Sequence, residues 1–228
     1  MRILALETST LQSSLALSDG ENVVSLTTLE PKQRTAQSLA PAIKNSLQLL
    51  DWSPKSLDLI ALSSGPGSFT GLRIGVTTAK MLAYATNAEI LGLDSLEVIA
   101  LQSPSDSSHV VAIMDAQRQQ LYAASFQRSA NNKIDRLSKT TIADQVSFLD
   151  SLASQHLLTG PGVKCIRDRL PVTIKVAEPA LWAPRADTVA RLANAAYARG
   201  KRDDLWQLVP QYFRKSAAEE KVLQKPLQ

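Results

Sequence analysis

The residues best suited to chemistry lie in a glycine-rich stretch, Ser64-Gly-Pro-Gly-Ser-Phe-Thr-Gly-Leu-Arg-Ile-Gly75, between an apolar run and an expected helix. Glycines accept positive φ and let a ligand approach closely, while the start of a helix offers free N–H groups and a positive dipole. An anion could bind there, although the spacing matches neither the dinucleotide fingerprint nor the P-loop. The alternative is a tight strand-to-helix turn in which Gly71 and Gly75 allow close packing. Both interpretations stand.

A second candidate is the hydroxyl-rich turn Glu7-Thr-Ser-Thr10 near the start of the chain. It resembles the first phosphate-binding turn of actin-like ATPases, in which hydroxyls and amides face a nucleotide phosphate. The strand before that turn usually ends in an Asp that handles the metal, whereas this chain has Glu7. A hairpin turn without a ligand fits the same residues. The phosphate-binding candidates are Thr8, Ser9, Thr10, Gly65, Gly67 and Ser68.

Metal-binding and nucleophilic constellations are sparse. The two histidines, His109 and His156, are too far apart for an i, i+4 metal pair, and Ser68 does not stand in a G-x-S-x-G elbow. Asp115 ends an expected strand, where it could act as a base or simply hydrogen-bond the following turn. The single cysteine, Cys165, cannot form an intramolecular disulfide and is interpreted as a buried hydrophobe. We therefore expect no catalytic residue and no metal site.

Composition bounds the class of protein. A chain of 228 residues with 44% hydrophobic content can bury a sizeable core as one large or two small domains. No apolar run approaches the roughly 20 residues of a membrane span, and the first ten residues lack the apolar core of a signal peptide. We expect a soluble cytoplasmic protein. The net charge of +4, from 25 Lys+Arg and 21 Asp+Glu, does not decide whether RNA is a partner.

The first hundred residues predict three strands and then alternating helices and strands. Expected strands cover residues 2–8, 13–18, 23–29, 57–63 and 90–93. Expected helices cover residues 35–50, with Pro41 as a possible kink, and residues 70–86, and a third begins at the capping box Asp94-Ser-Leu-Glu97. The polar stretch 102–108 then reads as a domain boundary.

The second half partly repeats this order. We expect strands at 109–115, 120–127, 156–159 and 172–177, and helices at 144–153, 163–170 and 184–199. The repetition predicts an α/β protein and resembles the two-lobed actin-like fold shared by sugar kinases and Hsp70, with duplicated βββαβαβα-type halves. The order of elements alone also permits other α/β folds. The predicted lobes are residues 1–104 and 105–228, with the tail after residue 210 packing back on the first.

Four stretches together resemble the TsaB (YeaZ) family over nearly the whole chain. They are LALETST, GPGSFTGLRIG, Asp115-Ala116 followed by Leu121-Tyr122, and Pro210-Gln-Tyr-Phe-Arg214. The family is similar in fold to TsaD, the catalytic subunit that transfers threonylcarbamoyl from its adenylate to the adenosine next to the tRNA anticodon. TsaB-like chains lack the metal-binding histidine pair of TsaD, and this sequence shares that lack.

The resemblance implies a non-catalytic scaffold subunit for threonylcarbamoyladenosine (t6A) synthesis. Its implied partners are a TsaD-like catalytic subunit, a TsaE-like ATPase, tRNA through the complex, and a second copy of the chain in a homodimer. No cofactor is firmly implied, and ATP or ADP could lie at the shared interface of the complex.

The helices from Thr35 and Thr70 are implied to form the partner face. The second helix is apolar on more than one stripe, and its small residues recur every four positions, which suits close helix packing. Packing against the first helix of the same chain is the alternative. The expected interface residues are Thr35, Leu39, Ile43, Gly71, Leu72, Gly75, Val76, Ala79 and Ala83.

Two stretches depart from the family pattern. Many relatives carry His-Ser-Glu where this chain has Thr35-Ala36-Gln37, and a basic residue with a Gly-Glu pair where it has Gln117-Arg118-Gln119-Gln120. These changes predict a divergent member.

The rival hypothesis is an enzyme of the same fold, either a small-molecule kinase or a weak nucleotide hydrolase. It would use Thr8–Thr10 and the loop Gly65–Gly71, with Asp115 as base and Glu7 at the metal. A metalloprotease would need metal ligands that the sequence lacks.

Overall fold

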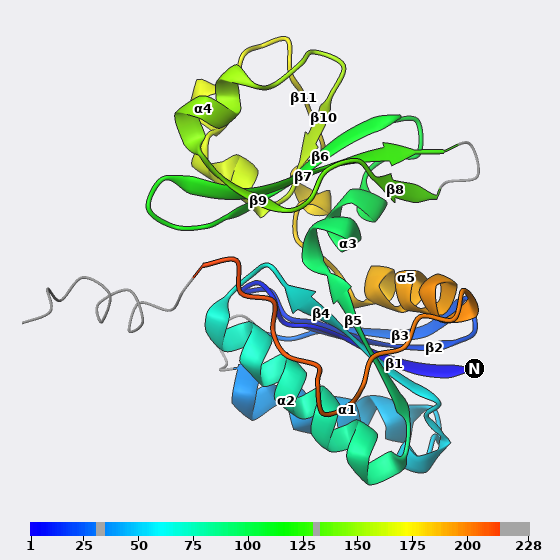
Figure 1. Cartoon of the computed structure of the whole chain (residues 1–228). Helices are drawn as coiled ribbons and strands as arrows, with labels where there is room; N and C mark the ends of the chain where they lie inside the picture. Colours follow the sequence, from blue (N-terminus) through cyan, green and yellow to red (C-terminus); the bar gives the residue numbers. More distant parts are fainter. Residues whose placement is uncertain (31–34, 130–132, 215–228) are drawn as a thin grey trace, which may run out of the picture.

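The computed structural model describes residues 1–30, 35–129 and 133–214. They form two lobes, each built on one sheet (Figure 1). The first sheet has the order β3-β2-β1-β4-β5. Its strands are β1 (Arg2–Glu7), β2 (Ser14–Asp19), β3 (Asn22–Thr28), β4 (Leu59–Gly65) and β5 (Glu89–Asp94).

The second sheet repeats the plan of the first. Its order β8-β7-β6-β10-β11 matches β3-β2-β1-β4-β5, with the same antiparallel pairs on one side and parallel pairs on the other. The strands are β6 (His109–Asp115), β7 (Gln120–Arg128), β8 (Ile134–Arg136), β9 (Thr141–Asp144), β10 (Leu157–Thr159) and β11 (Lys175–Val176), and β9 also pairs with β7. The predicted duplicated, two-lobed actin-like fold is confirmed.

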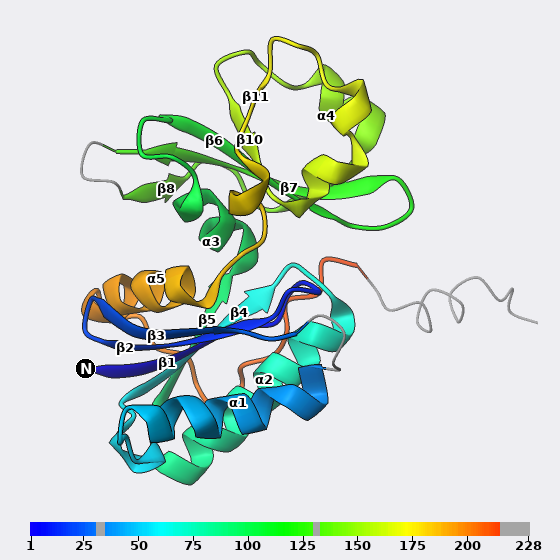
Figure 2. The same cartoon turned by 180° about the vertical axis from the view of Figure 1, so that it is seen from behind.

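Helices cover both faces of the first sheet. Helices α1 (Thr35–Leu49) and α2 (Phe69–Thr86) lie on one face and α5 (Ala186–Ala198) on the other (Figure 2). Side chains of β1 alternate between the two layers, because Leu4 and Leu6 join the core under α1 and α2 whereas Ile3 and Ala5 join the core under α5. Burial on both faces explains why the central strands β1 and β4 are nearly continuous apolar runs in the sequence.

The last helix of each half packs partly or wholly on the other half. Helix α3 (Ser95–Gln102) lies between the two sheets in Figure 1, and its Leu96 and Ile99 join the core of the second lobe. Its Val98 faces the core of the first lobe. Helix α5 lies in the stretch that we expected to build the second lobe, yet Val189 and Ala193 pack under the first sheet.

Two chain crossings connect the lobes beside α3. Residues 103–108 lead from α3 into β6, and residues 182–185 lead back to α5. The side chain of Gln102 ties the crossings together, because its Nε2 donates to the Ala183 carbonyl at 2.8 Å and its Oε1 accepts from the Arg185 amide at 2.7 Å. The lobes are therefore fastened to each other on this side.

Both ends of α3 are also fixed to the second lobe. The predicted cap is confirmed, since Asp94 Oδ1 accepts from the Leu96 amide at 2.8 Å, and Asp94 also pairs with Arg136 of β8 at 2.9 Å. At the other end, buried Arg128 of β7 donates to the Ala100 carbonyl at 3.0 Å. A cation at a helix C-terminus satisfies carbonyls that lack helical partners.

The structure corrects the prediction for part of the second lobe. The helix predicted at 163–170 is two 3-10 turns, η2 (Pro161–Cys165) and η3 (Arg167–Arg169), because Val163 and Ile166 are buried three residues apart and Pro171 disfavours a helix before it. The strand predicted at 172–177 shrinks to β11, and α4 (Gln145–Asp150) is shorter than predicted. Strands β8 and β9 were missed because they have only three and four residues.

The remaining elements are the turns η1 (Pro54–Ser56) and η4 (Pro179–Leu181). No helix among the described residues is long and apolar enough to span a membrane.

Candidate functional site: the cleft between the lobes

A cleft of about 1250 Å³ lies between the lobes, and its lining includes Ala183 of the second crossing. The first lobe contributes the β1–β2 turn and the start of α2, and the second contributes the β6–β7 hairpin and η2. The described part of the segment that follows α5 reaches the cleft with Gln211–Arg214. The lining includes Ser9, Thr10, Gly67, Ser68, Phe69, Arg73, Asp115, Arg118, Tyr122, Lys164 and Gln211–Arg214.

Glu7, at the end of β1, is completely buried behind the cleft. Its Oε1 accepts from the Ser9 amide at 2.6 Å and from Ser9 Oγ at 2.5 Å, and its Oε2 accepts from Ser63 Oγ of β4. Burial raises the pKa of Glu7, and the three hydrogen bonds oppose that rise. Both carboxylate oxygens are thus used to fix the β1–β2 turn against β4.

The glycine-rich loop is packed directly on the β1–β2 turn. The Ser68 amide donates to the Ser9 carbonyl at 2.7 Å, and a Cβ atom on Gly67 would lie 2.5 Å from that same oxygen. A Cβ atom on Gly71 would lie closer than 3.0 Å to the Thr8 carbonyl oxygen. These glycines are therefore required for close packing, which is the alternative that the sequence left open.

The predicted phosphate-binding residues divide into two groups. Thr8 is buried, and Gly65 is covered by the Gln211 carbonyl, 2.6 Å from where a Cβ of Gly65 would be. Ser9, Thr10, Gly67 and Ser68 line the cleft, although little of Ser9 is exposed. The Ser68 hydroxyl caps α2 by accepting from the Gly71 amide at 3.3 Å. Phosphate binding stays a prediction for all six residues, of which the four that line the cleft are the ones placed to contact a ligand there.

The β6–β7 hairpin forms the opposite wall and has an unusual backbone. Gln117, Arg118 and Gln119 all adopt positive φ, at 64°, 54° and 60°. The Gln120 amide closes the turn on the Gln117 carbonyl at 3.0 Å. Asp115 supports the turn, because its Oδ1 accepts from the Gln117 amide at 2.7 Å and its Oδ2 from the Gln117 side chain at 3.0 Å. The candidate base therefore has both oxygens engaged by its own turn.

Cations predominate around the cleft. Arg73, Arg118, Lys164 and Arg214 line it, and Asp115 is the single acidic residue of the lining. The result is a cleft whose field favours anions.

Aromatic side chains add apolar surface to this lining, and Tyr122 of β7 is one of them. Burial raises the pKa of Tyr122, so its hydroxyl remains protonated near neutral pH.

The two histidines do not reach the cleft. His109 begins β6 and His156 precedes β10, at the strand ends away from Asp115. Burial, with a smaller effect of His109, lowers the pKa of His156. No group of three or more His, Cys, Asp or Glu side chains suited to a metal occurs within the described part of the chain. Cys165 is partly buried, and burial raises the pKa of its thiol.

The expected interface residues are mostly interior. Seven side chains or glycines fill the core of their own lobe: Leu39, Ile43, Leu72, Gly75, Val76, Ala79 and Ala83. The Thr35 hydroxyl lies 3.1 Å from Ser13 Oγ, one residue before β2. The interface prediction is corrected for the seven, because the small residues pack inward against the sheet. A partner face on these helices stays a prediction for outward side chains such as Met81 and Tyr84, each 67% exposed.

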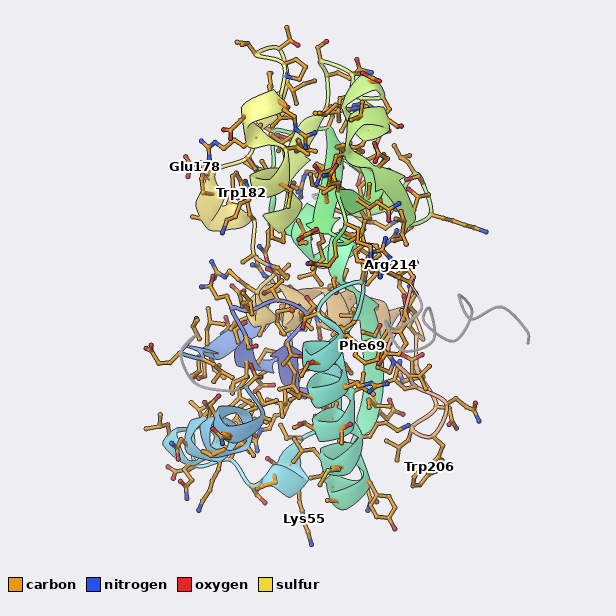
Figure 3. The ribbon with its side chains drawn as sticks, turned by 90° about the vertical axis from the view of Figure 1, so that its left-hand side faces the viewer. Lys55, Phe69, Glu178, Trp182, Trp206 and Arg214 are labelled. Atoms are coloured by element: carbon orange, nitrogen blue, oxygen red, sulfur yellow. The ribbon has the colours of Figure 1, made fainter. Side chains whose placement is uncertain are left out.

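Several cleft residues were missed by sequence reasoning. Arg118 and Lys164 were not singled out for the cleft, since their positions in the sequence show no distinctive spacing. Arg73 and Tyr122 stood in stretches that matched the family, but those side chains had no assigned role. The segment Gln211–Arg214 carried a signal, because it matched a family stretch, but that stretch had no assigned role. Figure 3 shows Arg214 above Phe69 at the level where the lobes meet.

Comparison with known proteins gives a consistent result. A family model described as TsaD, tRNA N6-adenosine threonylcarbamoyltransferase, matches residues 29–222. The tRNA threonylcarbamoyladenosine biosynthesis protein TsaB of Bacillus subtilis is 29% identical over 231 residues, covering 98% of this chain and 99% of that protein. The TsaB protein of Escherichia coli is 27% identical over 232 residues, covering 97% and 98%.

A solved structure shares the fold. YeaZ from Pseudomonas aeruginosa superimposes with a TM-score of 0.81 at 24% identity, covering 93% of this chain and 99% of that one. The two-lobed arrangement therefore extends over both proteins almost from end to end.

Proposed function

The chain belongs to the TsaB (YeaZ) family, and from that premise we propose that it acts in the synthesis of t6A in tRNA as a non-catalytic subunit. The observation that carries this proposal is the end-to-end similarity to two proteins named for threonylcarbamoyladenosine biosynthesis. Because the similarity extends over both lobes and the C-terminal segment, it concerns the whole arrangement and not one motif.

The state of the carboxylates supports a non-catalytic role. A kinase of this fold needs one carboxylate for the metal and a second as general base. Glu7 is buried and fully used by Ser9 and Ser63, and Asp115 is held by Gln117. Using either group would require the turn that it supports to rearrange. The cationic cleft leaves the kinase or hydrolase as the second candidate, with ATP or ADP as the expected ligand.

The proposed partners are a TsaD-like catalytic subunit and a TsaE-like ATPase, with tRNA reached through the complex. We place the partner face on the outward sides of α1 and α2. Leu49 of α1 and Met81 and Tyr84 of α2 are large apolar side chains that the chain leaves exposed. Exposed apolar side chains grouped on neighbouring elements mark interaction surfaces. A homodimer through the same face is the alternative assembly.

The experiment is nucleoside analysis of tRNA from cells depleted of the protein. The proposal expects t6A to fall and to return when the wild-type chain is supplied. The purified chain alone should show negligible ATP hydrolysis or phosphoryl transfer. Unchanged t6A after complete depletion would refute the role in its synthesis. Robust ATP turnover that is lost in an Asp115→Asn variant would instead favour the hypothesis of a kinase or hydrolase.

A further inference from the structure

The segment after α5 is anchored to the first lobe as far as the mouth of the cleft. Asp203 forms an isolated bridge with Ile90 at the edge of β5. Further along, Lys80 of α2 donates to the Trp206 and Leu208 carbonyls, both at 3.1 Å. These contacts bring the chain up α2 to the mouth of the cleft, where residues Gln211–Arg214, here named the strap, begin.

The first two residues of the strap contact the first lobe. The Gln211 amide donates to the Ser64 carbonyl at 2.7 Å, next to the glycine-rich loop. The Tyr212 ring lies 4.7 Å from the Phe69 ring, and its hydroxyl accepts from Arg73 Nε at 3.0 Å. Both Phe69 and Arg73 belong to the first turns of α2, so this half of the strap rests on a rigid element.

The last two residues of the strap contact the second lobe. The Phe213 ring lies 6.0 Å from the Tyr122 ring of β7. The Arg214 guanidinium donates to the Ala116 carbonyl at 2.5 Å and to the Gln120 side chain. Hydrogen bonds from a charged donor are among the stronger polar contacts in proteins. Both acceptors flank the strained β6–β7 turn, so Arg214 holds that turn toward the first lobe.

The strap therefore lies opposite the Gln102 crossings. Gln102 joins the two crossings on one side, where Figure 3 labels Trp182 of the second crossing. The strap spans the mouth of the cleft on the other side, where the figure labels Arg214. Two lobes hinged on one side move by changing the width of the open side. A connection placed there, and made of a few contacts rather than a continuous core, controls that width.

We propose that the strap Gln211–Arg214 is a latch that holds the cleft at its present width, and that its release lets the lobes open. Release from either lobe has the same consequence, because the strap holds the two lobes together only while both of its halves are bound. Losing the Tyr212 contacts with α2 therefore frees the β6–β7 turn, which the other half of the strap holds, and losing the Arg214 contacts frees the glycine-rich loop.

Hydrogen exchange of the full chain tests this cross-lobe coupling. The reporters are amides bonded within each wall: Ala116 to the Gln120 carbonyl at 2.9 Å in the second lobe, and Ser68 to the Ser9 carbonyl at 2.7 Å in the first. We expect Tyr212→Ala to speed exchange in the β6–β7 turn by about fivefold, as loss of one modest contact would. Arg214→Ala should speed exchange at Ser68 by a similar factor.

The matched control is Trp206→Ala, which removes an exposed aromatic of the same segment that packs edge-on against Tyr84, 5.7 Å away, before the strap begins. It should leave both reporters unchanged. Tyr212→Phe keeps the ring and removes only the hydroxyl contact with Arg73, so its effect on exchange in the β6–β7 turn should be in the same direction but smaller. This variant replaces Tyr212→Ala in the test if the alanine variant does not fold. The latch is refuted if each variant alters exchange only in the lobe that its own side chain touches.

Discussion

Gly71 lies so close to Thr8 that a Cβ atom on the glycine would come within 3.0 Å of the threonine carbonyl oxygen. Gly75, one turn further along α2, meets the Thr8 hydroxyl in the same way. The spacing of four residues therefore places the two glycines on one side of the helix, against the β1–β2 turn. Small residues repeated every four positions suit contact between two helices, but here they let α2 pack closely against the end of β1.

Replacing Gly71 by alanine should lower stability through steric overlap alone. The residue lies within α2 and its φ is not positive, so the backbone accepts alanine. The added Cβ must displace the Thr8 carbonyl, a shift that overpacking experiments place at about 1–3 kcal/mol. Urea denaturation of Gly71→Ala measures this loss. Gly20→Ala is the control, since nothing lies within 4 Å of that Cβ position and only its φ of +57° opposes the change. A smaller loss for Gly71→Ala than for Gly20→Ala would contradict the account.

The sequence predicted the duplicated fold because the order of elements repeats and buried strands read as apolar runs. Asp94 was recognised as a cap since its side chain acts on its own helix, within three residues. The second lobe was harder to predict. Its 3-10 turns and short strands are stabilised by tertiary packing around Val163 and Phe126, which local patterns do not encode.

The candidate site was predicted less well than the fold. In the structure, the glycine-rich loop and the β1–β2 turn lie together at the cleft, because they follow β4 and β1, which are parallel neighbours. Gly65 is covered by Gln211, which lies about 145 positions further along the chain. Sequence periodicity gives no information on a contact between residues so far apart. For the same reason the inward direction of Ala79 could not be told from an outward one.

A glycine at position 119 should stabilise the β6–β7 turn. Arg118 and Gln119 occupy the two central positions of a turn with positive φ, where residues with a Cβ are disfavoured. Gln119→Gly should raise the free energy of unfolding by about 0.5–1 kcal/mol. Gln127→Gly, an exposed position within β7, is the matched control and should lower stability by a similar amount. Thermal or urea denaturation of both variants tests the opposite signs; equal destabilisation would show that the positive φ values carry no strain.

Stability should fall as pH rises because of Glu7. Burial raises the pKa of Glu7 in the folded protein, so the folded state keeps its proton to a higher pH than the unfolded chain does. In the window above the ordinary glutamate pKa the folded state binds more protons, and the free energy of unfolding therefore decreases with increasing pH. The contribution is complete below that window and is lost as pH passes the raised value.

The variant Glu7→Gln isolates this effect, because Glu97 also has a pKa raised by burial and titrates in the same direction. A glutamine keeps the shape, and its amide can donate to Ser63 Oγ where the carboxylate accepted. Urea denaturation at about pH 5 and about pH 8 should show a smaller decrease for the variant than for the wild type. A wild-type decrease no larger than that of the variant would mean that Glu7 does not titrate in this range.

The partner face proposed for α2 makes opposite predictions for two neighbouring positions. Ala79 is fully buried between α2 and the sheet, so Ala79→Arg would place an unpaired charge in the core and should unfold the chain. Met81 points outward, so Met81→Arg should leave the circular dichroism spectrum and the denaturation midpoint unchanged. The same variant should weaken binding to a TsaD-like subunit by tenfold or more, because an interface anchor contributes about 1.4 kcal/mol or above. Val172→Arg, a fully exposed site on the second lobe, is the control and should bind normally. If Met81→Arg and Val172→Arg bind the partner with equal affinity, the face on α2 is wrong, whereas the role in t6A synthesis is tested separately by nucleoside analysis.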